Sequence, residues 1–292
     1  MTVGEMVIEV FEQLGEPSDI NPLDGTGAVD AASYGYGRIL MSLNAGQRAI
    51  ASWKDPSTGH LFRFRSCFGQ RIVQTNFIQA TLATNGTVDS FVLPTGTYAN
   101  NSLRGQIAKI GNETRLVVAN TGTTVVVAPS FTNAPVSGDA VAIYRRWVEI
   151  GEIGSIIDVM KVYDVEGATE LEHAAKIDGF LTSMTEIQTP SSWYRSGDKI
   201  LFDTAPAERR WYMLETYELP AAMVNPTDEP TLPEQFHYGI VLWALAWGFS
   251  RMIDVSKKRS LQSDFNLFMR STASELDLSG EREQDSFVPR LQ

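Results

Sequence analysis

The residues that could carry chemistry in this chain are scattered and form no recognisable metal-binding pattern. Three histidines, His60, His173 and His237, lie far apart and belong to no HExxH or comparable ligand pair, which argues against a zinc site. Cys67 is the only cysteine, so a cysteine cage and an intrachain disulfide are both excluded, and we interpret it as a buried apolar residue. We therefore expect neither a metal nor a cofactor.

Motifs for nucleotide binding and nucleophilic catalysis are equally hard to find. The glycine pairs at residues 25–27 and 35–37 follow no predicted strand and lead to no Gly-Lys-Ser/Thr ending, and no GxSxG elbow is present. Two carboxylates suffice for glycoside hydrolysis, and Glu149, Glu152 and Asp158 lie near one another in sequence. A solvated acidic face explains these three more simply, so we expect a protein that is not an enzyme and keep a glycosidase as an alternative.

Composition narrows the class of protein further. The chain has 292 residues, 43% of them hydrophobic and 20% charged, as in a globular protein, and a formal net charge of −11. That charge argues against an open nucleic-acid-binding surface but permits a surface past which DNA slides. The N-terminus is acidic and amphipathic, so we expect no signal peptide, and the apolar run at residues 240–249 falls short of the roughly 20 residues that span a membrane.

Helical patterns occupy both ends of the chain. Thr2 and Glu5 form a capping-box pattern, and an apolar stripe then runs to Leu14. A second helix is predicted over about residues 33–54. Near the C-terminus, one apolar helix is predicted from Leu232 to Ile253, followed by an amphipathic helix over residues 261–276.

The middle of the chain has the period of β-strands. Val- and Thr-rich runs separated by Gly and Asn turns favour a small antiparallel barrel or sandwich. The predicted strands are residues 71–77, 88–93, 106–110, 115–119, 123–127 and 140–144.

Residues 148–230 show mixed patterns. Residues 153–160 fit a strand or short helix, residues 171–180 have helical spacing, and residues 199–202 and 210–217 look like paired strands. A proline-rich linker follows at residues 220–233.

The economical architecture is α+β, in which the N- and C-terminal helices form one bundle with an inserted antiparallel β barrel or sandwich. We predict a helical core from residues 1–57 and 231–278, a β insertion at 58–147, a mixed connecting region at 148–230, and an extended tail at 279–292.

The helix that begins at Leu232 is apolar nearly all the way round, so it must be covered on every side, by its own chain or by a neighbouring copy. We predict that its aromatic residues Phe236, Trp243 and Trp247 contribute to a subunit interface. The basic run at residues 257–259 is interpreted as a solvated helix cap, with contact to an acidic partner as the alternative.

Three segments, taken in their order, resemble the head-to-tail adaptor (connector) proteins of tailed bacteriophages, the family of the gatekeeper and tail-accessory rings of short-tailed phages. Residues 39–51 look like the family's LNEAQRxIA helix, with Gly46 at an alanine-like position. Residues 105–139 are similar to a β module of phage structural proteins in which a PxxGDxY turn precedes a strand. Residues 232–276 resemble the family's closing helix pair.

This resemblance implies a ring, commonly of twelve copies, beneath the portal in the neck of the virion, made from chains synthesised in the host cytoplasm. The ring would extend the DNA channel, let DNA pass without sequence-specific binding, and dock tail or nozzle proteins. The tail at residues 279–292 would reach along the portal, with Phe287 and Val288 as apolar anchors and Arg282 and Arg290 as ionic ones. The family implies no catalytic residues.

Two other functions stay open at this point. One is a tail-associated cell-wall glycosidase that uses a carboxylate pair. The other is a carbohydrate-binding β module, which would need clustered exposed aromatic residues. The aromatic residues of the strand region look scattered instead: Phe77, Phe91, Tyr98, Phe131 and Tyr144.

Overall fold

The computed structural model describes residues 1–15, 18–54, 59, 61–94, 98–150, 156–174 and 185–278, with the backbone alone for 275–278. The chain divides into two compact units: the helical unit, Met1–Phe68 with Tyr217–Gln292, and the β unit, Gly69–Thr216. The helices lie in the first and most of the strands, mainly antiparallel, in the second, so the fold is α+β, as predicted. Across the described part of the chain, we find no helix with the length and hydrophobicity needed to cross a bilayer.

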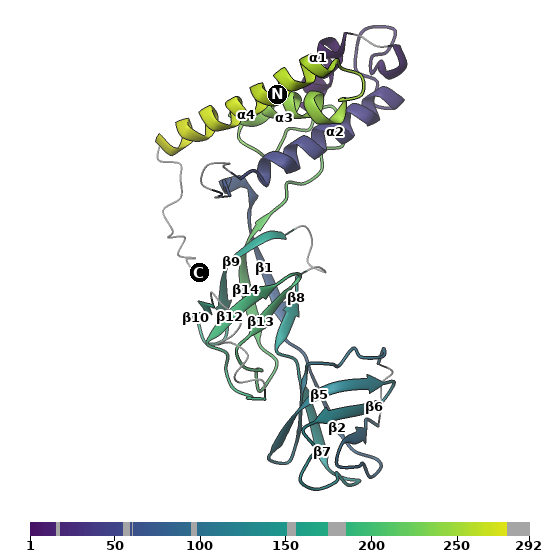
Figure 1. Cartoon of the computed structure of the whole chain (residues 1–292), viewed down its shortest axis with the longest axis vertical. Coiled ribbons are helices and arrows are strands. Elements are labelled where there is room, and N and C mark those ends of the chain that lie inside the picture. The colour runs from purple at the N-terminus through teal and green to yellow at the C-terminus, as the bar shows by residue number, and fades with distance from the viewer. Residues whose placement is uncertain are drawn as a thin grey trace. The chain divides into compact units, whose positions relative to one another are not determined.

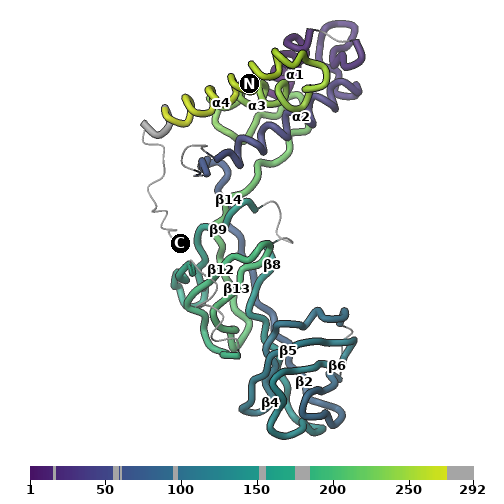
Figure 2. The backbone as a smooth tube through the Cα atoms, in the orientation of Figure 1, coloured from purple at the N-terminus to yellow at the C-terminus, as the bar shows by residue number. Residues whose placement is uncertain are grey.

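Two stretches far apart in sequence build the helical unit (Figures 1 and 2). The first supplies α1 (Val3–Leu14) and α2 (Tyr34–Ala51), and the second supplies α3 (His237–Trp243) and α4 (Val255–Leu278). α3 packs against both α2 and α4, while α1 packs against α2 and α3. The predicted bundle of N- and C-terminal helices is confirmed.

Local chemistry fixes where these helices begin and end. The Thr2 hydroxyl accepts the Glu5 N–H and the Glu5 carboxylate accepts the Thr2 N–H, so the predicted capping box is present. Gly15 ends α1 with a φ of 84°, a left-handed conformation that glycine adopts without strain. Ser33 caps α2 by accepting the Tyr36 N–H.

The apolar stretch predicted as one helix from Leu232 to Ile253 is built from several shorter pieces. A 3-10 turn, η4 (Glu234–Phe236), leads into α3, and a π-helical segment, η5 (Ala244–Gly248), follows before the chain turns into α4. Gly248 sits so close to α2 that a Cβ there would lie 2.6 Å from the Ser42 hydroxyl. Hydropathy alone cannot reveal the wider π turn, because its residues are as apolar as those of an α-helix.

The larger sheet of the β unit has six strands, each antiparallel to its neighbours, in the order β2-β7-β4-β5-β6-β3. The strands are β2 (Phe77–Thr81), β7 (Ala140–Tyr144), β4 (Ile107–Ile110), β5 (Glu113–Thr121), β6 (Thr124–Ala128) and β3 (Ser90–Val92). One face carries a core that includes Phe91, Ala108, Val117, Val125 and Ile143. β2 and β3 are outer strands that do not pair in the described structure, so the sheet is sandwich-like and open.

Two four-stranded sheets make up the rest of the described strands. One has the order β1 (Phe68–Gln74), β14 (Trp211–Glu218), β9 (Ile156–Asp164), β10 (Thr169–Glu170). The other has the order β11 (Glu172–His173), β12 (Ser192–Ser196), β13 (Lys199–Phe202), β8 (Trp147–Glu149), and its β11–β12 pair is parallel. Trp193, Phe202 and Tyr212 are fully or almost fully buried in a core that these strands share.

Three local predictions fail in this region. The strands at residues 199–202 and 210–217 do not pair, because β13 lies between β12 and β8, and β14 between β1 and β9. Residues 171–180 were predicted to be helical, but the described part contains strand β11, and residues 175–180 lie outside the described structure. The strand predicted over 71–77 is two strands in different sheets. Strand pairing depends on partners distant in sequence, which alternation along one segment does not identify.

Candidate assembly surface of the helical unit

Two polar side chains of α2 hold the proline-rich linker against the helix. The Asn44 amide donates to Met223 O at 2.9 Å and accepts the Met223 N–H at 2.8 Å. Gln47, which is fully buried, donates to Ala221 O and accepts the Thr231 N–H, each at 2.9 Å. These bonds satisfy linker backbone groups that no regular structure would satisfy, and they fix the path of the chain into α3.

Further hydrogen bonds hold the linker at residues 224–228. The Tyr36 hydroxyl donates to Val224 O at 2.8 Å. The Asp228 carboxylate accepts the N–H groups of Asn225 and Val224, which lowers the pKa of Asp228 from its ordinary value. The Val3 N–H, in the first turn of α1, donates to Asp228 O at 2.8 Å. The linker therefore joins α1 and α2 as well as leading into α3.

Gly46 sets the distance between α2 and α3. A Cβ at this position would lie 3.0 Å from Ile240 O, 3.3 Å from Ile240 Cγ2 and 3.4 Å from Trp243 Cβ. Glycine therefore allows the two helix backbones to approach more closely than alanine would. The close approach places Trp243 against α2.

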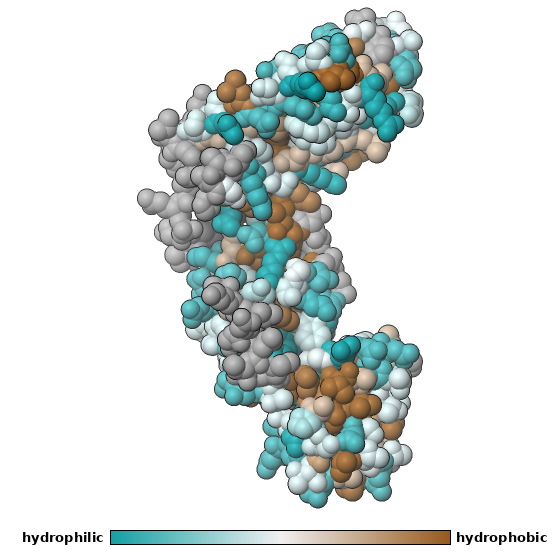
Figure 3. All heavy atoms as spheres, in the orientation of Figure 1, coloured by the Kyte–Doolittle hydropathy of each residue, from teal (hydrophilic) through white to brown (hydrophobic). Residues whose placement is uncertain are grey.

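Trp243 and Trp247 form a stacked pair, with ring centroids 5.8 Å apart and ring planes 20° apart. Trp247 also meets the buried Phe265 of α4 edge-on, at 5.2 Å. Trp247 keeps 38% of its surface exposed, and Trp243 is half-buried. An indole so placed leaves apolar surface that a partner could cover. Hydrophobic residues, in brown, also lie among hydrophilic ones on the surface of the helical unit in Figure 3.

Phe236 has a different environment from the two tryptophans. It has no exposed surface and packs against Phe64 in an edge-to-face contact, with centroids 4.7 Å apart, and more loosely against Phe62. Phe236 is a core residue of the protomer, so the interface proposed below does not include it.

Tyr217 links the end of α2 to the segment that follows it. Its hydroxyl donates to Ala51 O, at the end of α2, and accepts the Phe64 N–H. Burial raises the pKa of the Tyr217 phenol. Cys67 is buried, as predicted, and burial raises the pKa of its thiol, which disfavours the reactive thiolate.

Two of the three carboxylates considered for catalysis lie in ion pairs. Glu149 pairs with Arg145, and Asp158 pairs with Arg195 at 3.3 Å, whereas Glu152 lies outside the described residues. No group of His, Cys, Asp and Glu in the described regions could hold a metal ion.

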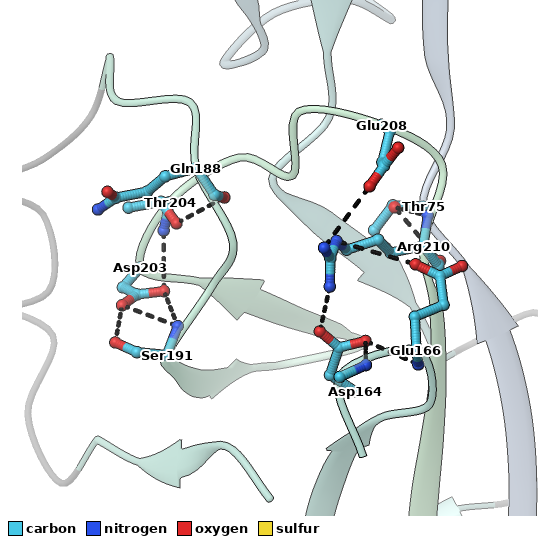
Figure 4. A network of polar contacts seen from close by, with 10 residues as sticks. Thr75, Asp164, Glu166, Gln188, Ser191, Asp203, Thr204, Glu208 and Arg210 are labelled. Atoms are coloured by element: carbon cyan, nitrogen blue, oxygen red, sulfur yellow. Dashed lines mark hydrogen bonds and ion pairs between the residues drawn. The ribbon is translucent and has the colours of Figure 1, made fainter. Parts of the chain in front are cut away.

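A second polar network lies in the β unit around Arg210 (Figure 4). Arg210 pairs with Asp164, whose side chain is only 1% exposed, and reaches Glu208 at 3.6 Å and Glu166 at 3.9 Å. This arginine supplies the positive charge that the buried Asp164 carboxylate needs, so we interpret the network as structural.

The aromatic residues of the strand region form no platform for a sugar ring. Phe91, Phe131 and Tyr144 are buried, and Phe77 stacks on Tyr144 with centroids 5.8 Å apart. Tyr98 packs against the core of the six-stranded sheet.

Of the other residues predicted from sequence, the structure describes the basic run but not the portal-binding residues. The predicted portal-binding residues Arg282, Phe287, Val288 and Arg290 lie outside the described structure. The basic run at 257–259 lies in the first turns of α4, where Lys257 Nζ donates to Gln13 O at 2.8 Å. Lys257 thus caps the end of α1 rather than the helix that precedes it in sequence.

Sequence reasoning missed the roles of Asn44 and Gln47. Both lie within the motif at residues 39–51 that resembles a phage adaptor helix. Gln47 lies at helical spacing from Leu43 and Ile50, and an amide on this otherwise apolar face is a signal that a buried backbone group needs a partner. Asn44 lies off that face and carries no such signal.

A comparison with protein-family models matches residues 1–289 to the model described as SU10 adaptor protein. A search of curated proteins finds no match. The family match covers both units and confirms the resemblance to phage adaptors that the three sequence segments indicated. The chain therefore belongs to the SU10 adaptor protein family.

Proposed function

We propose that this protein is a structural head-to-tail adaptor, not an enzyme, that forms a ring of twelve copies beneath the portal of a tailed phage. The ring extends the DNA channel and docks tail or nozzle proteins. The observation that carries the proposal is the stacked Trp243–Trp247 pair, which leaves part of an aromatic surface open on the unit built from both chain ends. Membership of an adaptor family supports the same role.

The interface between copies includes Trp247, with Trp243 behind it. Large aromatic residues that are partly exposed in the free subunit are favoured as anchors, because covering them removes apolar area from water. The formal charge of −11 fits a channel that DNA passes without sequence-specific binding, since like charge repels phosphate.

Docking on the portal is assigned to residues 279–292, with Phe287 and Val288 as apolar anchors and Arg282 and Arg290 as ionic ones. The segment therefore offers both apolar and cationic side chains to a partner surface.

Two variants test these roles separately. Deleting residues 279–292 should leave a folded protein that no longer attaches to purified portal rings. Trp247→Ala should still attach but should not complete a ring, while Trp211→Ala, which removes a tryptophan 44% exposed in the β unit, should assemble normally. Unchanged docking of the truncated protein would disprove the tail assignment, and normal rings from Trp247→Ala would disprove the interface.

A further inference from the structure

Charge is segregated within the helical unit. Residues 1–33 contain seven acidic residues and no Lys, Arg or His. Residues 251–274 contain five basic residues and two acidic ones. In these two stretches the structure shows no ion pair among the residues that it describes.

The outward face of α1 is a line of glutamates. Glu5, Glu9 and Glu12 are spaced by four and three residues, which places them on one side of the helix, opposite the buried Val3, Met6, Val7, Val10 and Phe11. Glu5 belongs to the capping box and Glu9 accepts a hydrogen bond from Gln13. Glu12 is exposed. The line spans about 10 Å at the helical rise of ~1.5 Å per residue.

The outward face of α4 carries the opposite charge. Arg259 and Arg270 are eleven residues apart, close to three turns, so they point the same way, about 16 Å apart along the helix. Leu267 lies beside them with 68% of its surface exposed. The other side of α4 is buried through Leu261, Phe265 and Met269. Asp264 lies at the flank and is hydrogen-bonded to Ser260.

These two faces belong to different helices of the unit. α4 packs on α3, while α1 packs on α2 and α3. A hydrogen bond from Lys257 Nζ to Gln13 O joins the first turn of α4 to the last turn of α1. A closed ring uses a head-to-tail contact between two unlike faces of the subunit, which matches this arrangement.

We propose that the glutamate face of α1 on one copy docks against the arginine face of α4 on the next copy, with Leu267 at the contact. The inference rests on the proposed ring and names its mating surfaces. The occupant is a second copy because each face carries the charge that the other lacks, and neither is neutralised within the described chain. Copies with a formal charge of −11 repel one another at long range, so their contact needs a local cationic surface such as that of α4.

A charge exchange tests the pairing. The first variant carries Glu9→Lys and Glu12→Lys, the second carries Arg259→Glu and Arg270→Glu, and the third carries all four changes. The third keeps the formal charge of −11, because two Glu→Lys changes add four charges and two Arg→Glu changes remove four. Arg209→Glu, at an exposed position of the β unit, is the matched control. Circular dichroism checks that each variant is folded.

Association of full-length copies, alone and on portal rings, is measured by mass photometry and electron microscopy over a salt series. We expect the association constant of each two-site variant to be at least about tenfold lower than that of the wild type. Divided between two reversed charges, this is a small effect per charge, as is usual for partly exposed ion pairs. The four-site variant should recover, the control should be unaffected, and added salt should weaken the wild-type contact. Folded two-site variants that assemble as strongly as the wild type, or a four-site variant that is folded but not rescued, would overturn this pairing alone. Wild-type copies that never associate would overturn the proposed ring as well.

Discussion

Gly46→Ala tests how strongly the close approach of α2 and α3 limits the size of the side chain at position 46, and so the stability of the helical unit. Alanine has a higher helix propensity than glycine by about 1 kcal/mol, so the change would be stabilising on a helix face with free space. At Gly46 the new methyl group would lie 3.0 Å from Ile240 O, a backbone atom that can move only with its helix.

Gly37→Ala is the matched control on the same helix. A Cβ at Gly37 has no atom within 4 Å. This variant should gain about 0.5–1 kcal/mol from propensity alone. Gly46→Ala gains the same amount but adds an overpacking cost of about 1–3 kcal/mol. The expected difference between the two alanine variants is therefore that same overpacking cost, about 1–3 kcal/mol, with Gly46→Ala the less stable of the two.

Urea unfolding followed by far-UV circular dichroism measures this difference, since the described helices all lie in the helical unit. Equal stability of Gly46→Ala and Gly37→Ala, or a stabilised Gly46→Ala, would refute the reasoning that the Ile240 carbonyl limits the approach of the helices. Displacement of Trp243 should also change tryptophan fluorescence in Gly46→Ala but not in Gly37→Ala.

Further predictions concern the other polar contacts. Tyr217→Phe removes the hydroxyl bonded to Ala51 O and the Phe64 N–H, and should lower the free energy of unfolding by about 1–2 kcal/mol in denaturant titrations. Arg210→Met leaves Asp164 buried without its cation and should destabilise the β unit by about 3 kcal/mol; adding Asp164→Asn should restore part of that loss, and no restoration would contradict the structural interpretation. Burial raises the pKa values of Cys67 and Tyr217, so the unfolded chain loses these protons first as pH rises. Stability should be intact below pH 9.0, the ordinary pKa of the thiol, and should fall above it; a Cys67→Ala variant should show a weaker decline between there and the tyrosine range.

Patterns local in sequence predicted α1, α2 and α4, but the stretch from Leu232 to Ile253 is several shorter pieces and not the one helix predicted. The Thr2–Glu5 capping box and the apolar stripe placed α1, and an apolar face at helical spacing over residues 33–54 placed α2. Strands β4, β6 and β7 fall within a residue or two of the predicted runs. In each case the signal comes from neighbours along the chain, namely a cap, a period or a turn.

Strand pairing, burial and hydrogen bonds that depend on residues distant in sequence could not be predicted from such local patterns. Nothing in residues 199–202 identifies β8 and β12 as the neighbours of β13. The sequence grouped Phe236 with Trp243 and Trp247 because all three are aromatic, yet the structure buries the first and leaves Trp247 partly exposed. The contacts of Asn44 and Gln47 span 174 to 184 residues of sequence, so only the fold shows what they hold.

The proposed role requires that copies of this chain form a ring on a portal. Electron microscopy of the full-length protein mixed with the portal of its own phage tests it most directly. We expect class averages with an added ring of twelve subunits coaxial with the portal channel, and no added ring when residues 279–292 are deleted. Portals that stay bare in the presence of excess folded wild-type protein would contradict the claim.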